Sequence, residues 1–115
     1  MNIIGDTTTV GLHEALRGLD ARRSAHETNI ANVETPGYKA RSVQFESALR
    51  RAMASGEPLD ATPTVQVSNA YGRANGNNVN VAEEMVGLTE AALTQQLVIR
   101  ALNDKYGLIR DAIGR

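Results

Sequence analysis

The sequence predicts an all-α protein whose two long terminal helices pack side by side as an elongated, coiled-coil-like hairpin. Three observations point to this fold class. Apolar residues recur at alternating spacings of four and three through the C-terminal third of the chain, and a weaker stripe of the same period runs through the N-terminal third. The 115 residues also include only one Phe, three Tyr and no Trp. Because aromatic side chains normally fill much of a globular core, their scarcity favours an elongated single domain, 1–115.

The first element is expected to be a helix over residues 7–34. Its stripe is aliphatic at five of seven positions and is interrupted in the middle by Arg23 and His26. Glycine lowers intrinsic helicity by roughly 1 kcal/mol inside a helix. Gly11 and Gly18 therefore make this helix dependent on a partner. The aliphatic side chains predicted to pack against that partner are Leu12, Leu16, Leu19, Ile30 and Val33.

A turn should follow near Thr35, because a residue before proline disfavours helical dihedral angles. Pro36 and Gly37 form the preferred central pair of a type II turn. Residues 35–41 are therefore expected to turn and then to leave in an extended direction.

A short helix is predicted over 42–55, with Ser42 as its N-cap and Gly56 at its C-terminal end. Residues 56–79 contain prolines, glycines, asparagines and threonines and few large apolar side chains. This stretch is expected to be an irregular, extended connection. Residues 65–67 alternate as a strand does, so a short β segment is the other interpretation of this region.

The last helix is predicted over 80–113. Asn80 is a good N-cap, and Glu83 completes a variant of the capping box. At a rise of about 1.5 Å per residue the helix would be about 50 Å long. Nine of the ten positions of its stripe are apolar or aromatic, and we expect the whole stripe to be a packing surface: Val81, Met85, Leu88, Ala92, Gln95, Ile99, Leu102, Tyr106, Ile109 and Ile113.

Two features of this helix are not explained by packing against a single partner helix. Gln95 is either a polar residue that the stripe tolerates or a device that fixes the alignment of the two helices. Val86, Leu93 and Leu97 lie opposite the stripe and predict a second contact face. A single chain of this length cannot bury both faces, so the second face points to other subunits.

The chain offers little for chemistry. His13 and His26 are thirteen residues apart, which is not a metal-binding spacing on one helix, and there are no cysteines. The net charge is −1 with acids and bases interspersed, which argues against nucleic acid as a partner. We therefore expect no catalytic residues, cofactor, metal or small-molecule substrate. The sequence also shows no cleavable signal peptide and no apolar stretch near the ~20 residues of a membrane span.

The segment from Asn29 to Lys39 closely resembles the motif at the end of the N-terminal helix in the bacterial flagellar axial proteins, that is, the rod, hook and hook-associated proteins. Residues 77–85 and 102–106 resemble the proximal subunits within the basal-body rod family. The resemblance covers both terminal regions, whereas 56–76 matches no pattern of that family. The motif positions are Asn29, Asn32, Thr35, Pro36, Gly37, Tyr38 and Lys39.

This resemblance implies a structural protein of the flagellum that serves motility and has no enzymatic activity. Such a subunit would self-assemble through its terminal helices into the rod, a helical drive shaft that transmits torque across the periplasm. The implied partners are other copies of the chain, other rod proteins, the inner-membrane ring or its adapter protein, and the flagellar type III export apparatus. Export by that apparatus would place the protein in the periplasmic rod without a cleavable signal peptide.

Two alternatives stay open at this point. A cytoplasmic helical-hairpin adaptor or chaperone could form a closed coiled-coil dimer through the same stripe, although it would leave the turn motif and the second apolar face unexplained. Another short subunit of the same rod is the alternative within the family. Sedimentation separates a saturating dimer from a rod protein, which stays monomeric or polymerises.

Overall fold

A computed structural model describes residues 7–58 and 61–114 of the chain. It contains three helices and two strands within the described residues. In chain order these are α1 (Thr7–Ala31), β1 (Arg41–Gln44), α2 (Glu46–Ser55), β2 (Thr64–Val67) and α3 (Val81–Ile113).

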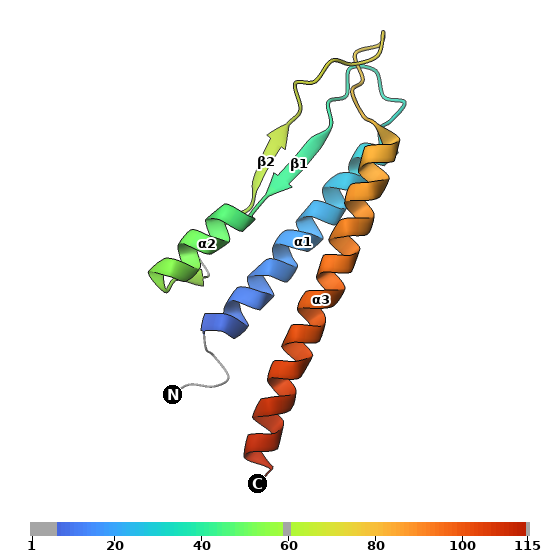
Figure 1. The fold of residues 1–115 in the computed structure, drawn as a ribbon. Helices are drawn as coiled ribbons and strands as arrows, with labels where there is room; N and C mark the ends of the chain where they lie inside the picture. Colours follow the sequence, from blue (N-terminus) through green and yellow to red (C-terminus); the bar gives the residue numbers. More distant parts are fainter. Residues whose placement is uncertain (1–6, 59–60, 115) are drawn as a thin grey trace.

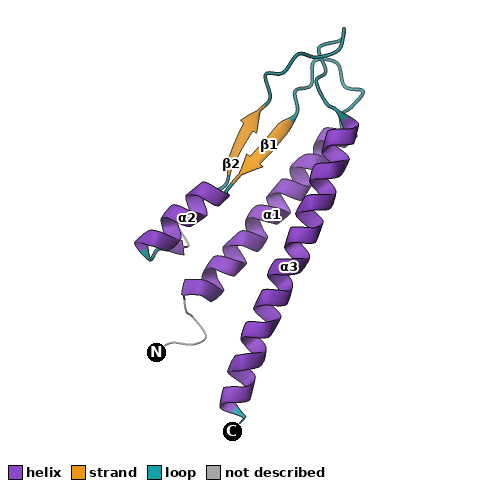
Figure 2. Cartoon of the chain, viewed as in Figure 1, coloured by secondary structure: helices purple, strands orange, loops and turns teal. Residues whose placement is uncertain are grey.

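The two long helices lie side by side and run in opposite directions, while the paired strands β1 and β2 and helix α2 flank α1 (Figures 1 and 2). The molecule measures 65 × 26 × 14 Å, with a radius of gyration of 17.8 Å. A compact domain of this length would have a radius of gyration of about 13 Å. The predicted elongated, mostly helical fold with packed terminal helices is confirmed, and the structure adds a small two-stranded sheet.

The sheet corrects the predicted start of the short helix. β1 and β2 pair antiparallel, with Val43 opposite Val65. Val43 and Phe45 are buried, whereas Ser42 and Gln44 are exposed, which is the period-two alternation of a strand. Ser42 therefore lies within β1 and not at a helix N-cap, and helix α2 begins only at Glu46. The N-cap position is taken by Phe45, which makes no side-chain capping bond because a phenyl ring has no hydrogen-bond acceptor for it.

The hydrophobic core lies where α1 meets both α3 and the first strand. Its buried members are Leu19, Val43, Phe45 and Ala91. A Cβ atom at Gly18 would lie only 2.4 Å from Cγ of Phe45. The glycine that weakens α1 as an isolated helix therefore lets the Phe45 ring approach the helix backbone.

The first helix is shorter than predicted. It ends at Ala31, and residues 32–37 form consecutive turns. The turn expected at this place is present: the Tyr38 N–H donates to the Thr35 carbonyl at 3.2 Å, and Gly37 has a φ of 74°. A positive φ of this size is accessible to glycine at little cost.

The last helix begins as predicted. The Asn80 side chain accepts a hydrogen bond from the Glu83 N–H at 3.2 Å, which satisfies one of the free donors at a helix N-terminus. From there α3 runs for 33 residues. It is the longest element of the described chain, and its N-terminal end adjoins the loop that follows β2 (Figure 1).

Candidate functional site

Asn29 ties three segments together at the end of α1. It is fully buried, and its side chain donates to the Arg41 carbonyl at 2.8 Å and to a Glu84 carboxylate oxygen at 2.9 Å. Its amide oxygen accepts from the Tyr38 hydroxyl and from the Arg41 N–H, both at 3.0 Å. One side chain thus connects α1, the start of β1 and the first turn of α3.

Asn77 does the same for the turn after α1. It is also fully buried, and its side-chain N–H₂ donates to the carbonyls of Asn32 and Thr35, both at 2.8 Å. Its amide oxygen accepts from the Val79 N–H at 2.9 Å. Carbonyls at the end of a helix lack intrahelical partners, so a buried amide at this place satisfies groups that the turn leaves open. Arg73 adds a further bond to the Val33 carbonyl.

Asn78 and Lys39 complete this network. The Asn78 amide oxygen accepts from the Ala40 N–H at 2.6 Å, and its N–H₂ donates to the Ser68 carbonyl at 3.3 Å. The Lys39 ammonium donates to the Gly76 carbonyl at 2.6 Å. We call the three side chains Asn29, Asn77 and Asn78 the asparagine cluster. It fixes the end of the helix pair at which the chain reverses direction.

The remaining motif residues act locally. The Asn32 side chain donates to the Thr28 carbonyl at 2.8 Å and accepts from the Thr35 hydroxyl at 3.1 Å. Pro36 and Gly37 form the turn and are exposed. The structure therefore brings six of the seven motif residues into hydrogen bonds around this turn, and Pro36 is the exception.

Polar side chains cross between α1 and α3 at three levels. His26 Nδ1 lies 2.6 Å from Oε2 of Glu84, which forms an ion pair when the imidazole is protonated. Arg23 donates to the Gln95 amide oxygen at 2.7 Å, and the Gln95 N–H₂ donates to Asp20. The third level joins His13 and Tyr106, with Nε2 2.7 Å from the hydroxyl. On α3 these contacts come from residues 84, 95 and 106, which are eleven residues apart. We call them the polar rungs.

The predicted stripe of α3 is wider than the surface that α1 covers. The three buried residues of this helix are Glu84, Ala91 and Leu102, of which only the last belongs to the stripe. Four members of the stripe are half-buried, namely Leu88, Ala92, Gln95 and Ile109. The other five are 40–74% exposed: Val81, Met85, Ile99, Tyr106 and Ile113.

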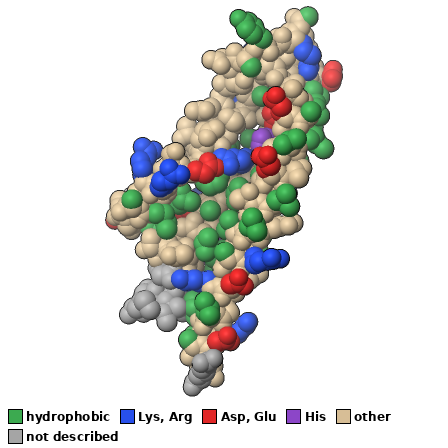
Figure 3. Space-filling model, viewed as in Figure 1, with side chains coloured by type: hydrophobic (Ala, Val, Ile, Leu, Met, Phe, Trp, Pro, Cys, Tyr) green, Lys and Arg blue, Asp and Glu red, His purple; other side chains and the backbone are tan. Residues whose placement is uncertain are grey.

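The other predicted packing residues divide in the same way. On α1 and the turn after it, Leu19 is buried and Leu12, Leu16, Ile30 and Val33 are half-buried. The predicted second face of α3 is open to solvent, with Val86 and Leu93 each 57% exposed and Leu97 66% exposed. Figure 3 shows hydrophobic side chains gathered on the front face between α2 and α3.

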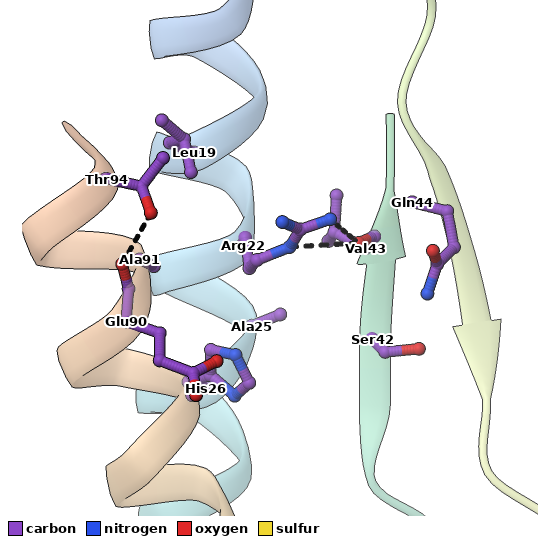
Figure 4. Close-up of a pocket in the computed structure, with 11 residues that line it drawn as sticks. Leu19, Arg22, Ala25, His26, Ser42, Val43, Gln44, Glu90, Ala91 and Thr94 are labelled. Atoms are coloured by element: carbon purple, nitrogen blue, oxygen red, sulfur yellow. Dashed lines mark hydrogen bonds between the residues drawn. The ribbon is translucent and has the colours of Figure 1, made fainter. Parts of the chain in front are cut away.

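A cavity of about 320 Å³ lies between α1, α3 and β1 (Figure 4). Arg22 extends across its wall and donates to the Val43 carbonyl at 2.8 and 3.2 Å. Its guanidinium also lies 4.7 Å from the centre of the Phe45 ring. These contacts of the Arg22 guanidinium hold β1 against α1. The positive charge in the cavity wall therefore serves the fold and is not free to bind a ligand.

Among residues 7–58 and 61–114, no group of three or more His, Cys, Asp or Glu side chains is placed to hold a metal ion. Within the same part of the chain, no helix combines the length and the apolar character needed to cross a membrane.

Sequence reasoning missed the partners of the polar side chains. No local pattern joins Glu84 to Asn29, or Asn77 to the carbonyl of Asn32, because more than forty residues separate the members of each pair. The available signal was the interruption of the N-terminal stripe by Arg23 and His26, because polar residues in one buried stripe require polar residues in the stripe opposite. Phe45 and Arg73 gave no comparable signal.

No protein-family model matches the chain. Similar proteins are nevertheless known, and they share one description, flagellar basal body rod protein FlgB. The one from Bacillus subtilis is 28% identical over 120 residues, which span 92% of each chain. The one from Aeromonas hydrophila is 31% identical over 117 residues, or 87% of this chain and 89% of the relative. The Escherichia coli K12 protein is 42% identical over 55 residues, or 48% of this chain and 38% of the relative. The chain therefore belongs to the FlgB family of flagellar basal body rod proteins, which are structural proteins of the rod and not enzymes.

Proposed function

We propose that the chain builds its part of the rod by packing α1 and α3 against the same helices of neighbouring subunits, including other copies of itself. The observation that carries this proposal is the distribution of apolar side chains around α3. One side of the helix packs on α1, whereas two further sides expose large apolar groups. The predicted packing residues on these sides would become buried on assembly.

The energetic argument concerns the exposed side chains of α3. Leu97, Leu108 and Ile113 are 66%, 71% and 74% exposed. Full burial of one such side chain stabilises by about 1.5–3 kcal/mol relative to full exposure. Exposed apolar groups that gather on one element mark interaction surfaces in soluble proteins. Burial between subunits would therefore favour assembly over the free subunit.

The motif residues have a different role in this proposal. Their hydrogen bonds stay within the subunit and fix the end where α1, β1 and α3 meet. We infer that they hold the β1–β2 pair against α1. The two long helices would then form the wall of the tube, and the strands would lie along one side of it.

Family membership places the chain with other rod proteins in the basal body. We propose more specifically that it lies in the proximal, periplasmic part of the rod, next to the inner-membrane ring or its adapter protein. We also propose that it reaches this place through the flagellar type III export apparatus. Torque would pass along the interlocked helices from one subunit to the next.

The test is the presence and packing of the chain in isolated basal bodies. Cells that lack their own copy are supplied with either the natural chain or Leu108→Ser, and basal bodies are analysed by immunoblotting and cryo-electron microscopy. We expect the natural chain in the rod and the variant largely absent from it. A natural chain that is missing from the rod, or that sediments only as a saturating closed dimer, would contradict the proposal.

A further inference from the structure

The side of α3 that faces away from α1 carries an apolar ridge. Glu84, Ala91 and Gln95 face α1. Val86, Leu93 and Leu97 each come two residues later, about 200° further around the helix, and therefore face away from α1. All three are more than half exposed. Glu83 lies on the same surface as Val86, so an acidic side chain flanks the upper end of the ridge.

The side of α1 that faces away from α3 carries a groove. Its floor consists of small side chains of α1, including Ala21 and Ser24, and one wall is formed by Val65 of β2 and by Arg41. The groove has a volume of about 300 Å³, and Val65 is 60% exposed above it. A helix that approaches here meets a concave, mainly apolar surface with a positive charge at its upper end.

The ridge and the groove are level with each other along the molecule. Asn29 bonds both the Glu84 carboxylate and the Arg41 backbone, so the first turns of α3 lie at the height of Arg41. Gln95 bonds Asp20, which places the middle of the ridge at the height of the groove floor. A second molecule placed beside the first with little axial shift would therefore set its ridge against this groove.

We propose that the ridge of one copy of this chain docks in the α1 groove of a second copy. Large side chains meet small ones, and Glu83 approaches Arg41. Because the two surfaces lie on opposite sides of the molecule, the contact is heterologous and leaves a free ridge and a free groove at each end. It propagates from copy to copy, as a tube wall requires. The inference rests on the proposed assembly and specifies the faces that meet.

The first test uses cysteine cross-linking, because the natural chain has no cysteine. A double variant, Ser24→Cys with Leu93→Cys, is produced in place of the natural chain, and basal bodies are isolated and oxidised. Asp111→Cys with Leu93→Cys is the matched control, because Asp111 is exposed near the C-terminal end of α3, away from the α1 groove. We expect a ladder of dimers, trimers and larger products for the first pair, and no ladder for the control.

Several outcomes overturn the inference. They are a chain that is present in basal bodies without a ladder, a ladder of equal strength in the control, and cross-links to a different rod protein alone. Absence of the natural chain from basal bodies would instead contradict the proposed function, so the two failures are distinguishable.

A second measurement applies when the cysteine pair does not assemble. Arg41→Glu and Glu83→Arg should each lower the amount of chain in basal bodies roughly tenfold, because like charges then face each other across the contact. The double reversal should restore most of that amount. A double variant that is no better than either single variant would overturn the inference. Thermal unfolding of the purified chains, followed by circular dichroism, checks that all three variants fold.

Discussion

Arg23 on α1 and Gln95 on α3 are partners, with the guanidinium Nη1 2.7 Å from the amide oxygen. Gln95 is the polar residue that breaks the apolar stripe of α3, and Arg23 is one of the two that interrupt the stripe of α1. The amide of Gln95 also donates to Asp20, so both ends of this side chain are engaged. This geometry favours Gln95 as a device that aligns the helices over its interpretation as a tolerated polar residue.

Gln95→Leu should destabilise the folded chain, although leucine matches the apolar residues at the other positions of the stripe. The variant removes the acceptor of the half-buried Arg23, and a buried donor without a partner costs about 1–3 kcal/mol. Urea unfolding followed by circular dichroism measures the loss. The double variant with Arg23→Leu should recover part of it, and strictly additive losses would show that the two side chains are not coupled.

Asn29→Ala should be among the most damaging single substitutions. It leaves the Glu84 carboxylate, the Tyr38 hydroxyl and the Arg41 backbone without their buried partner, for an expected loss of about 3 kcal/mol. Asn103→Ala is the matched control, because Asn103 is exposed on α3 and its replacement should change stability by less than about 0.5 kcal/mol. Equal effects on the urea midpoint would contradict the role assigned to the asparagine cluster.

Two glycines should respond to alanine in opposite directions. At Gly18 a Cβ atom would collide with the Phe45 ring, so Gly18→Ala should cost about 1–3 kcal/mol through overpacking. At Gly107 the nearest atom to a Cβ is Nη2 of Arg110 at 3.9 Å. Gly107→Ala should therefore stabilise by up to about 1 kcal/mol through helix propensity. Melting temperatures of the two variants test the prediction, which fails if both shift the same way.

Leu97→Ser should separate assembly from folding. Leu97 is 66% exposed, so its replacement should leave the unfolding midpoint of the free chain nearly unchanged. Swimming and the amount of chain in basal bodies should fall strongly, because the predicted contact between subunits loses an apolar side chain. Gln96→Ser, on the neighbouring exposed position, should swim normally. Normal motility of Leu97→Ser would exclude this face from assembly.

The long helices and the turn between them were predictable because their signals are local. The period of the apolar stripes, the Asn80 cap and the Pro36–Gly37 pair each depend on residues within a few positions of one another. The first strand was not predictable in this way. Val43 and Phe45 alternate with polar residues as a strand does, but the alternation is too short to decide by itself. The pairing with β2 across about twenty residues decides for the strand.

The polar rungs could not be predicted from the sequence for a different reason. Their members are separated by 58, 72 and 93 residues along the chain, so no local pattern joins them. Each side chain taken singly is a solvated charge or an interruption of a stripe. The same holds for Asn77, whose acceptors Asn32 and Thr35 lie more than forty residues away.

The eleven-residue spacing of the rungs has a mechanical consequence. Apolar side chains tolerate sliding by one helical turn, because one aliphatic contact replaces another of similar energy. Hydrogen bonds at three separate heights do not tolerate such sliding, since a shift of one turn breaks all of them together. Under torque, neighbouring helices of a shaft experience shear along their axes. Glu84, Gln95 and Tyr106 act against this shear as three fixed points along α3, and α1 and α3 therefore carry such a load as one body.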